Sequence, residues 1–300
     1  MFDVIIVGGG CAGLSAALIL GRCRRRTILF DRGTPRNASA QALHGFLTRD
    51  GIPPAEFLKI AQRQLEIYDT VEYRAAEVVD AQQNLSGFEV TLKNGSRFQS
   101  RKLLIATGVA DHIPPLAGLL PLYGSSVFHC PYCDGWEVRE QPLVVYGQAK
   151  RAYGLALELQ LWSRQVTICT DGPSGFTRRM LSALLREEVP VLETRVDRLE
   201  GQNGQIERIV FVDGTSVNCR ALFFSTGQQQ RCDFPRRLGC IFNKKGTVMT
   251  GKYESTNIRG LYVAGDASRD VQMAIVAAAE GAQAAFAINT ALIEEDRRAP

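Results

Sequence analysis

The stretch DVIIVGGGCAG, residues Asp3–Gly13, opens this chain of 300 residues. Its apolar half, Val4 to Val7, is typical of a buried parallel strand, and Leu14 to Leu20 has the composition of a helix. The glycines between them have the spacing Gly-x-Gly-x-x-Gly, which permits a tight turn and lets a phosphate approach the helix N-terminus. In this strand–turn–helix setting the motif indicates a dinucleotide site rather than a simple glycine turn.

An acidic residue stands where such a site needs one. A second apolar strand, Thr27 to Phe30, ends at Asp31, and a carboxylate there is placed to accept hydrogen bonds from ribose hydroxyls. We therefore expect the turn and this acid to contact the dinucleotide, through Gly8, Gly10, Cys11, Ala12, Gly13 and Asp31.

Two later segments resemble strand ends of the same domain. The apolar run 103–106 ends in Thr107-Gly108, and the run 260–264 ends in Gly265-Asp266 before an alanine-rich helix expected over 272–285. A Gly-Asp pair between a strand and a helix suits a flavin dinucleotide, because the carboxylate takes the ribityl hydroxyls while helix N-terminal amides face the flavin. We expect Thr107, Gly108, Gly265 and Asp266 to belong to the cofactor site.

The middle of the chain repeats this pattern. A strand over 143–146, a glycine turn at 147–152, a helix, a strand over 165–169 and a run ending in Thr226-Gly227 follow one another. The repetition predicts an α/β protein with two Rossmann-like, three-layer nucleotide-binding domains, the second inserted into the first. We place the discontinuous domain at residues 1–113 and 243–300, and the inserted domain at 114–242.

A redox dithiol lies in the inserted domain, in His129-Cys130-Pro131-Tyr132-Cys133-Asp134-Gly135. One turn of chain brings two thiols with this spacing within disulfide distance, and the acid next to the second can exchange a proton with the leaving thiolate. Zinc requires four ligands, and the chain has one Cys-x-x-Cys pair and three histidines in all. The pattern favours redox chemistry and no metal site.

Composition excludes some classes of partner. The net charge of +4 is too small to indicate nucleic acid binding. A local basic run, Arg22 to Arg26, is either charge at a helix end or a docking patch. The chain shows no pattern of a signal peptide and no apolar run of membrane-spanning length, and Cys11, Cys169, Cys219 and Cys240 resemble small core residues. These features predict a cytoplasmic protein with one working dithiol.

Taken together, these motifs resemble the low-molecular-weight thioredoxin reductases over essentially the whole chain. The resemblance implies FAD in the discontinuous domain, a homodimer, and thioredoxin as the substrate. It also implies that Cys133 faces the flavin, that Cys130 attacks the disulfide of the partner protein, and that Asp134 is the catalytic acid. By the same resemblance, Asn37 and the helix start at Gln272, Met273 and Ala274 join the FAD site.

The inserted domain departs from the family at its nucleotide site. Its turn has Ala149 where the family has a second glycine, and Asp171, between Thr170 and Gly172, stands where the family places cationic residues for the 2′-phosphate of NADPH. NADPH is therefore disfavoured, although Asp171 could accept the ribose hydroxyls of NADH. The resemblance then points to the ferredoxin-dependent branch or, alternatively, to dithiol oxidases that pass electrons from a small dithiol to oxygen. A non-enzymatic nucleotide-sensing scaffold is a further alternative that the dithiol argues against.

Two histidines are candidate bases for such an oxidase. His129 precedes Cys130 and is either a base or a loop residue that orders the turn, and His44 is expected near the flavin by analogy.

Overall fold

The opening apolar run forms β1 (Phe2–Val7), which lies between β2 (Thr27–Asp31) and β6 (Arg97–Ile105) in a seven-stranded sheet. The structure is a computed structural model, and it describes residues 1–298. Strands β1, β2 and β6 are parallel, as are two further strands, β3 (Val71–Ala75) and β17 (Leu261–Val263). Two antiparallel strands, β4 (Val78–Asn84) and β5 (Gly87–Leu92), complete the sheet next to the first half of β6.

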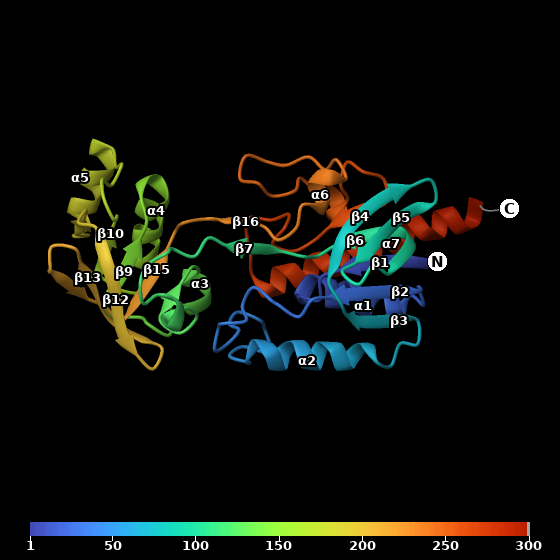
Figure 1. Cartoon of the computed structure of the whole chain (residues 1–300), viewed down its shortest axis with the longest axis horizontal. Helices are drawn as coiled ribbons and strands as arrows, with labels where there is room; N and C mark the ends of the chain where they lie inside the picture. The colour runs from blue at the N-terminus through green and yellow to red at the C-terminus, as the bar shows by residue number, and fades with distance from the viewer. Residues whose placement is uncertain (299–300) are drawn as a thin grey trace. The chain divides into compact units, whose positions relative to one another are not determined.

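Both faces of this sheet are covered. Each face of the sheet has its own hydrophobic core, and alternate residues of β1 belong to different cores. Val4 and Ile6 face α1 (Cys11–Arg22) and α7 (Ala274–Arg298), whereas Ile5 and Val7 face the other side. The helices α1 and α7 touch closely, because a Cβ on Gly281 would lie 2.0 Å from the carbonyl oxygen of Ala12. Helix α2 (Pro54–Leu65) packs outside α1 (Figure 1).

Helix α7 corrects one sequence expectation. It has 25 residues and is long and apolar enough to cross a membrane by length and composition alone, although no such run was expected. Its Ala284, Ala285, Ile288 and Leu292 are buried in the core that α7 shares with α1. This packing is that of a core helix.

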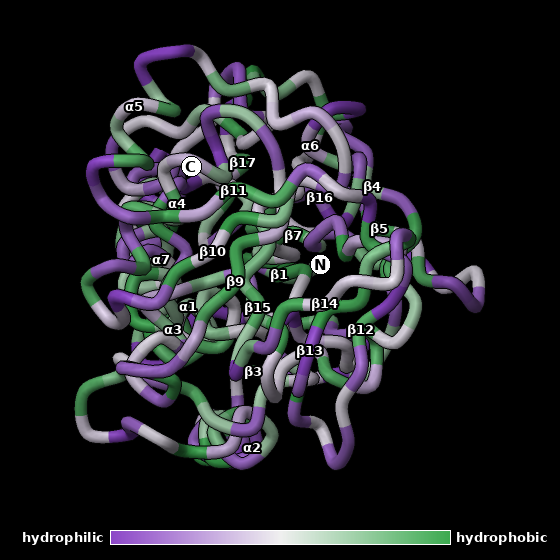
Figure 2. The backbone as a smooth tube through the Cα atoms, turned by 90° about the vertical axis from the view of Figure 1, so that its left-hand side faces the viewer, coloured by the Kyte–Doolittle hydropathy of each residue, from purple (hydrophilic) through white to green (hydrophobic). Residues whose placement is uncertain are grey.

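The inserted part has its own parallel sheet, in the order β11 (Val191–Leu192), β10 (Val166–Cys169), β9 (Leu143–Tyr146), β15 (Ala221–Phe224) and β8 (Val127–Phe128). Helices α4 (Ala149–Leu159) and α5 (Arg178–Arg186) cover one face. The antiparallel strands β12 (Val196–Gln202), β13 (Gln205–Phe211) and β14 (Ser216–Asn218) cover the other face. The buried strands β9, β10 and β15 are largely hydrophobic along their length (Figure 2). The predicted α/β class with two three-layer Rossmann-type folds is confirmed.

The chain divides into two compact units. Unit 1 comprises residues 1–38, 45–110 and the chain from 228 onward, and unit 2 comprises 39–44 and 111–227. The chain leaves and re-enters unit 1 through two short paired strands, β7 (Val109–Asp111) and β16 (Gln228–Gln230). The return at Gly227 precedes the expected boundary at residue 242, because Phe234 of α6 (Phe234–Arg237) and Cys240 pack in the core of unit 1. The assignment of 39–44 to unit 2 had no signal in the sequence.

The basic run at the end of α1 is engaged within unit 1. The Arg25 guanidinium donates to Asn289 Oδ1 (2.8 Å) and to Asp296 Oδ2 (2.7 Å), and Arg26 lies over the ring of Phe2. The run also lies at the far end of α1 from the glycine turn, since a helix of 12 residues is about 18 Å long. These contacts favour the helix-end interpretation for Arg25, whereas Arg22, Arg24 and Arg26 are exposed.

Candidate active site

In unit 1 the glycine turn is shaped by close backbone contacts. Gly8 has φ 110°, and a Cβ there would lie 2.3 Å from the carbonyl oxygen of Ala106. A Cβ on Gly13 would lie 1.9 Å from the carbonyl oxygen of Gly8. Gly10 caps α1 without a side-chain hydrogen bond, and no heavy atom lies within 4 Å of its Cβ position. The turn therefore leaves open space beside the helix N-terminus, where a pyrophosphate would be stabilised.

Asp31 lies beside this turn, as expected. Its Cγ is 2.6 Å from the Cβ position of Gly9, so that position admits only glycine. The hydroxyl of Tyr73 donates to Asp31 Oδ2 (3.1 Å), and burial, then the charge of Asp31, raises the pKa of Tyr73 to about 12. Tyr73 fixes the carboxylate and was not found from the sequence, because it comes from β3, far along the chain.

The second half of the predicted cofactor site meets the first turn of α1. Gly265 has φ 79°, its N–H donates to Glu280 Oε2 (2.7 Å), and its Cβ position is 3.2 Å from the Cβ of Ala12. Burial, and then the charge of Asp266, raises the pKa of the Cys11 thiol to about 12. Thr107 and Gly108 follow β6 at the same edge of the sheet, next to Gly8.

Arg36 is a member of this site that sequence reasoning missed. Its Nη1 donates to Asp266 Oδ2 (2.8 Å) and to Gln272 Oε1 (2.7 Å). Asn37 follows it, partly buried, in the turn after β2. Met273 packs near Gly45, and α7 begins at Ala274 rather than at 272. The glycine turn leaves open space for a pyrophosphate, and Asp31 and Asp266 place carboxylates on two sides of it. With the Arg36 cation beside Asp266, this arrangement suits a flavin dinucleotide.

In unit 2, Cys130 and Cys133 form a disulfide with a Cα–Cα distance of 5.3 Å. The short helix α3 (Pro131–Asp134) begins directly after Cys130 and carries both Cys133 and Asp134. Burial, reinforced by the charge of Glu137 and opposed by His44, raises the pKa of Asp134 to about 7. His44 Nε2 lies 3.5 Å from Glu137 Oε1. His44 is thus placed near the dithiol of its own unit by the segment 39–44.

His129 also has carboxylate and hydroxyl partners. Its Nε2 lies 3.8 Å from Asp111 Oδ2, and its Nδ1 lies 3.4 Å from the hydroxyl of Tyr123. The interpretation of His129 as a residue that only orders the turn does not account for its ion-pair partner. That partner is a buried acid, since the Asp111 side chain is only 6% exposed.

The nucleotide-like turn of unit 2 is closed by its own chain. Ala149 has φ 51°, a left-handed conformation that costs an L-residue about 1 kcal/mol, and its N–H donates to the carbonyl oxygen of Ser174 (2.8 Å). Asp171 accepts hydrogen bonds from the hydroxyl of Tyr146 (2.8 Å) and from the N–H of Val196 (2.8 Å). The amide that would meet a phosphate and the carboxylate that would meet a ribose both have partners within the protein.

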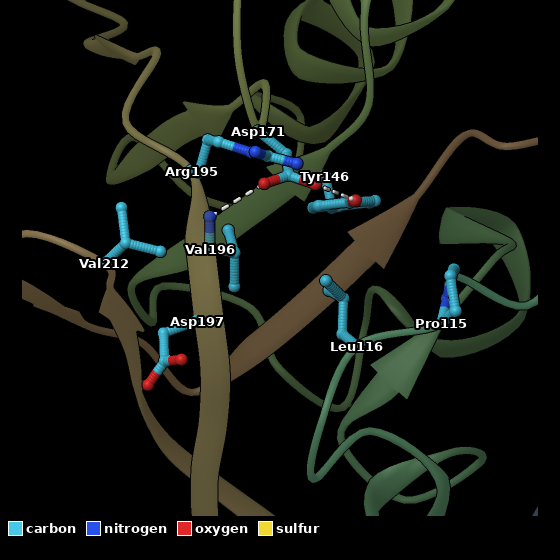
Figure 3. A pocket seen from close by; sticks show the side chains of 8 residues that line it. All are labelled: Pro115, Leu116, Tyr146, Asp171, Arg195, Val196, Asp197 and Val212. Atoms are coloured by element: carbon cyan, nitrogen blue, oxygen red, sulfur yellow. Dashed lines mark hydrogen bonds between the residues drawn. The ribbon is translucent and has the colours of Figure 1, made fainter.

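A cavity of about 540 Å³ opens beside Asp171 (Figure 3). Tyr146, Leu116 and Val196 contribute apolar surface to it, and Arg195 and Asp197 contribute charge. The carboxylate of Asp171 is turned toward Tyr146 and the backbone of Val196. A phosphate at this edge of the sheet would meet the carboxylates of Asp171 and Asp197 together with the guanidinium of Arg195.

The buried thiols are structural. Cys169, Cys219 and Cys240 are buried, and burial raises the pKa values of Cys169 and Cys219 to about 12. Thiols that ionise so poorly are inert in disulfide exchange. Within residues 1–298, no cluster of three or more His, Cys, Asp or Glu side chains is arranged to hold a metal ion.

Comparison with known proteins defines the class. A model of the pyridine nucleotide-disulphide oxidoreductase family matches residues 2–281, and the chain belongs to this family. It is a thioredoxin reductase-like, flavin-dependent disulfide oxidoreductase, as its relatives show. The chain is 30% identical to the thioredoxin reductase tcpT of Claviceps purpurea over 88% of its length and 86% of the relative. It is 29% identical to the thioredoxin reductase aclD of Aspergillus oryzae over 99% of its length and 98% of the relative.

A solved structure agrees with these relatives. The chain is similar to TrxB of Bacillus anthracis, which is described as a thioredoxin reductase, with 32% identity and a TM-score of 0.93. The likeness covers 99% of this chain and all of the other. The expected likeness to thioredoxin reductases is confirmed at this level.

Proposed function

We propose that this enzyme holds FAD in unit 1 and passes electrons between the flavin and the Cys130–Cys133 disulfide, and on to thioredoxin. Members of the family generally bind FAD, and the relatives named above are thioredoxin reductases. The residues that would hold the cofactor are the predicted turn and strand ends, together with Arg36. When bound, FAD would supply the electron pair that opens the disulfide.

The protein's own residues would then carry out thiol–disulfide exchange. The Cys130 thiolate attacks one sulfur of the thioredoxin disulfide, and a mixed disulfide forms as the other sulfur leaves and takes a proton. The Cys133 thiolate attacks the Cys130 sulfur of that mixed disulfide, which releases the second thioredoxin sulfur and restores the Cys130–Cys133 disulfide. Asp134, with its pKa near 7, can give a proton to a departing thiolate and later recover it.

The electron donor that we propose is reduced ferredoxin rather than NADPH. The observation that carries this proposal is the closed turn of unit 2, where Ser174 occupies the N–H of Ala149 and Asp171 replaces a cation. A hydride donor needs a nicotinamide held against the flavin, whereas a one-electron carrier needs only an approach to the flavin edge and no site in unit 2.

A second candidate is a dithiol oxidase that passes electrons from a small dithiol to oxygen. Two observations favour it. A histidine with an acidic partner precedes Cys130 and could take the proton of an incoming thiol. Arg25 of the Arg22–Arg26 run is paired with Asn289 and Asp296, which weakens this run as a docking surface for an acidic electron donor.

Anaerobic bleaching of the flavin distinguishes these candidate functions. The enzyme is mixed with NADPH, NADH, reduced ferredoxin or a small dithiol, and the flavin absorbance is followed. We expect rapid bleaching with reduced ferredoxin and slow or no bleaching with NADPH. Rapid bleaching by NADPH would overturn the argument from Asp171. Bleaching only by the dithiol, with peroxide formed when oxygen is admitted, would establish the oxidase.

Arg36→Leu tests the cofactor site. We expect FAD affinity to fall about 10- to 100-fold, because a partly buried Asp266 loses its ionic partner, an effect of about 1.4–3 kcal/mol. Fluorescence titration of the apoenzyme with FAD measures the change. Arg32→Leu, an exposed arginine in the same segment, is the matched control and should bind FAD normally. Equal affinities in the two variants would remove Arg36 from the site.

We further propose a cytoplasmic homodimer. The family resemblance supports the dimer, and the six free cysteines beside a single disulfide suit a reducing compartment. Sedimentation equilibrium at micromolar concentration tests the dimer, and a single monomeric species would refute it. Fractionation of the source cells tests the location.

A further inference from the structure

The loop between β17 and α7 carries Asp266 of the predicted cofactor site, and Arg269 lies in its middle. The Arg269 guanidinium is paired with two acidic side chains from outside the loop. Its Nε donates to Glu280 Oε1 (2.8 Å) in α7, and its Nη2 donates to Glu254 Oε1 at the end of the short helix η2 (Lys252–Glu254). Both acids are buried, since the side chain of Glu254 is 1% exposed and that of Glu280 is 6% exposed. Arg269 therefore balances two carboxylates that are shielded from water.

Each of the two buried acids also holds a second group. Glu280 Oε2 accepts the N–H of Gly265 (2.7 Å) at the start of the loop, and Glu254 Oε2 accepts the hydroxyl of Thr250 (3.1 Å). Tyr253 and Glu254 have φ values of 57° and 62°, a left-handed conformation that such residues keep only where contacts hold them in it. The buried carboxylates thus fix two chain segments, 250–254 and 265–269, against α7.

A series of hydrogen bonds leads from Arg269 to the carboxylate of Asp266. Gln272 Nε2 donates to the carbonyl oxygen of Arg269 (3.2 Å), and Gln272 Oε1 accepts from Arg36 (2.7 Å). Arg36 donates in turn to Asp266 Oδ2 (2.8 Å). The position of Asp266 is therefore set from two sides, by the anchored Gly265 before it and by the Arg269–Gln272 contact after it.

We infer that Arg269 is a positioning residue for the cofactor: paired with Glu254 and Glu280, it holds the loop 265–273 in the conformation that binds FAD before FAD binds. A loop that is ordered in advance loses little conformational freedom on binding, so more of the interaction energy appears as affinity. The planar guanidinium suits this role because it donates to two carboxylates at once, as a lysine ammonium does less well. The inference rests on the proposed function for the identity of the cofactor, but not for the order of the loop.

Two measurements on Arg269→Met test this inference in parallel. Fluorescence titration of the apoenzyme gives the affinity for FAD, and hydrogen exchange followed by mass spectrometry gives the order of the loop without any cofactor. Both are made at pH 8, because burial raises the pKa of Glu280 to about 7 and this acid is then mostly ionised. We expect FAD affinity to fall about 30-fold and exchange in 265–273 to become about tenfold faster, because two buried acids lose their cation.

Matched variants separate positioning from folding. Arg269→Lys keeps the charge but not the fork, so its FAD affinity should lie between those of Arg269→Met and the unaltered enzyme. Asp270→Asn removes only the exposed contact with Lys245 in the same loop, and it should leave affinity and exchange unchanged. The melting temperature and the exchange in β1 and α1 show whether each variant keeps the rest of unit 1. If Arg269→Met does not fold, Arg269→Lys is compared with Asp270→Asn instead.

The outcomes distinguish this inference from the proposed function. An FAD affinity in the folded Arg269 variants equal to that of Asp270→Asn would overturn the inference, as would unchanged exchange in 265–273. Faster exchange in this loop, in a protein that binds no flavin even when unaltered, would leave the anchoring of the loop in place and refute the proposed function.

Discussion

Cys130→Ser is expected to abolish disulfide exchange while the enzyme keeps its FAD. We expect turnover with thioredoxin, or with a small dithiol, to fall by at least about 10³-fold, because a serine hydroxyl is neither ionised near neutral pH nor able to form the mixed disulfide. The flavin content and the melting temperature should change little, because Cys130 is in unit 2 and the predicted cofactor residues are in unit 1. Steady-state assays and flavin absorbance measure the two effects separately.

Two further cysteine variants make the result interpretable. Cys133→Ser should also block turnover, but it leaves Cys130 free to form a mixed disulfide that no longer resolves, which mass spectrometry of the intact complex detects. Cys23→Ser, which removes an exposed free thiol at the end of α1, should keep full activity. Normal thioredoxin reduction by Cys130→Ser would show that the proposed attacking residue is wrong.

The fold was predictable because its main signals are local. The glycine turn at 8–13 and the apolar strands around it indicate a Rossmann-type unit from neighbouring residues alone. The recurrence of the pattern from residue 143 indicates the second unit. The return to unit 1 was placed too late because 228–242 has no strong periodicity. Its membership depends on Phe234 and Cys240, which pack against strands from the start of the chain.

The candidate site was predictable where a motif carries it. The dithiol, its acid and the acids at the ends of β2 and β17 each follow a short pattern. In the structure Asp31 ends β2, Asp266 follows β17, and Cys133 and Asp134 lie in α3. Arg36, Tyr73 and Asp111 follow no pattern. Each acts through a partner far along the chain, such as Asp266 for Arg36, and composition does not encode such contacts. His44 belongs to this group, because segment 39–44 lies in unit 2.

The basic run shows the limit of reasoning from charge alone. Four arginines within five residues suggest a docking surface, yet Arg25 is paired with Asp296 near the end of α7. Charge in a sequence identifies residues that need a partner or solvent, but it does not say which. The closed turn at Ala149 is a firmer argument, because it depends on a backbone conformation and a hydrogen bond.

Asp134→Asn should change both the rate and its dependence on pH. We expect turnover to fall about 10²-fold, the usual contribution of a positioned acid. In the unaltered enzyme, steps that need protonated Asp134 should slow as the pH rises through about 7. Glu137→Gln should move this limb to lower pH, because the charge of Glu137 raises the pKa of Asp134. His44→Gln should move it to higher pH. The variant Asp134→Asn should show no such limb.

The raised pKa of Asp134 also predicts how the stability of the folded protein depends on pH. The pKa of Asp134 is about 7 in the folded protein against 3.8 for an unperturbed carboxyl, so the folded state binds the proton more tightly. Its contribution to stability is complete below pH 3.8 and is lost as the pH rises to 7, by up to about 4 kcal/mol. Asp134→Asn should therefore be more stable than the unaltered enzyme at pH 8, and this advantage should shrink at pH 5. Urea denaturation of the holoenzymes at both pH values measures the difference. An advantage equal at the two pH values would show that Asp134 is ionised throughout, and it would remove this residue as the proton donor.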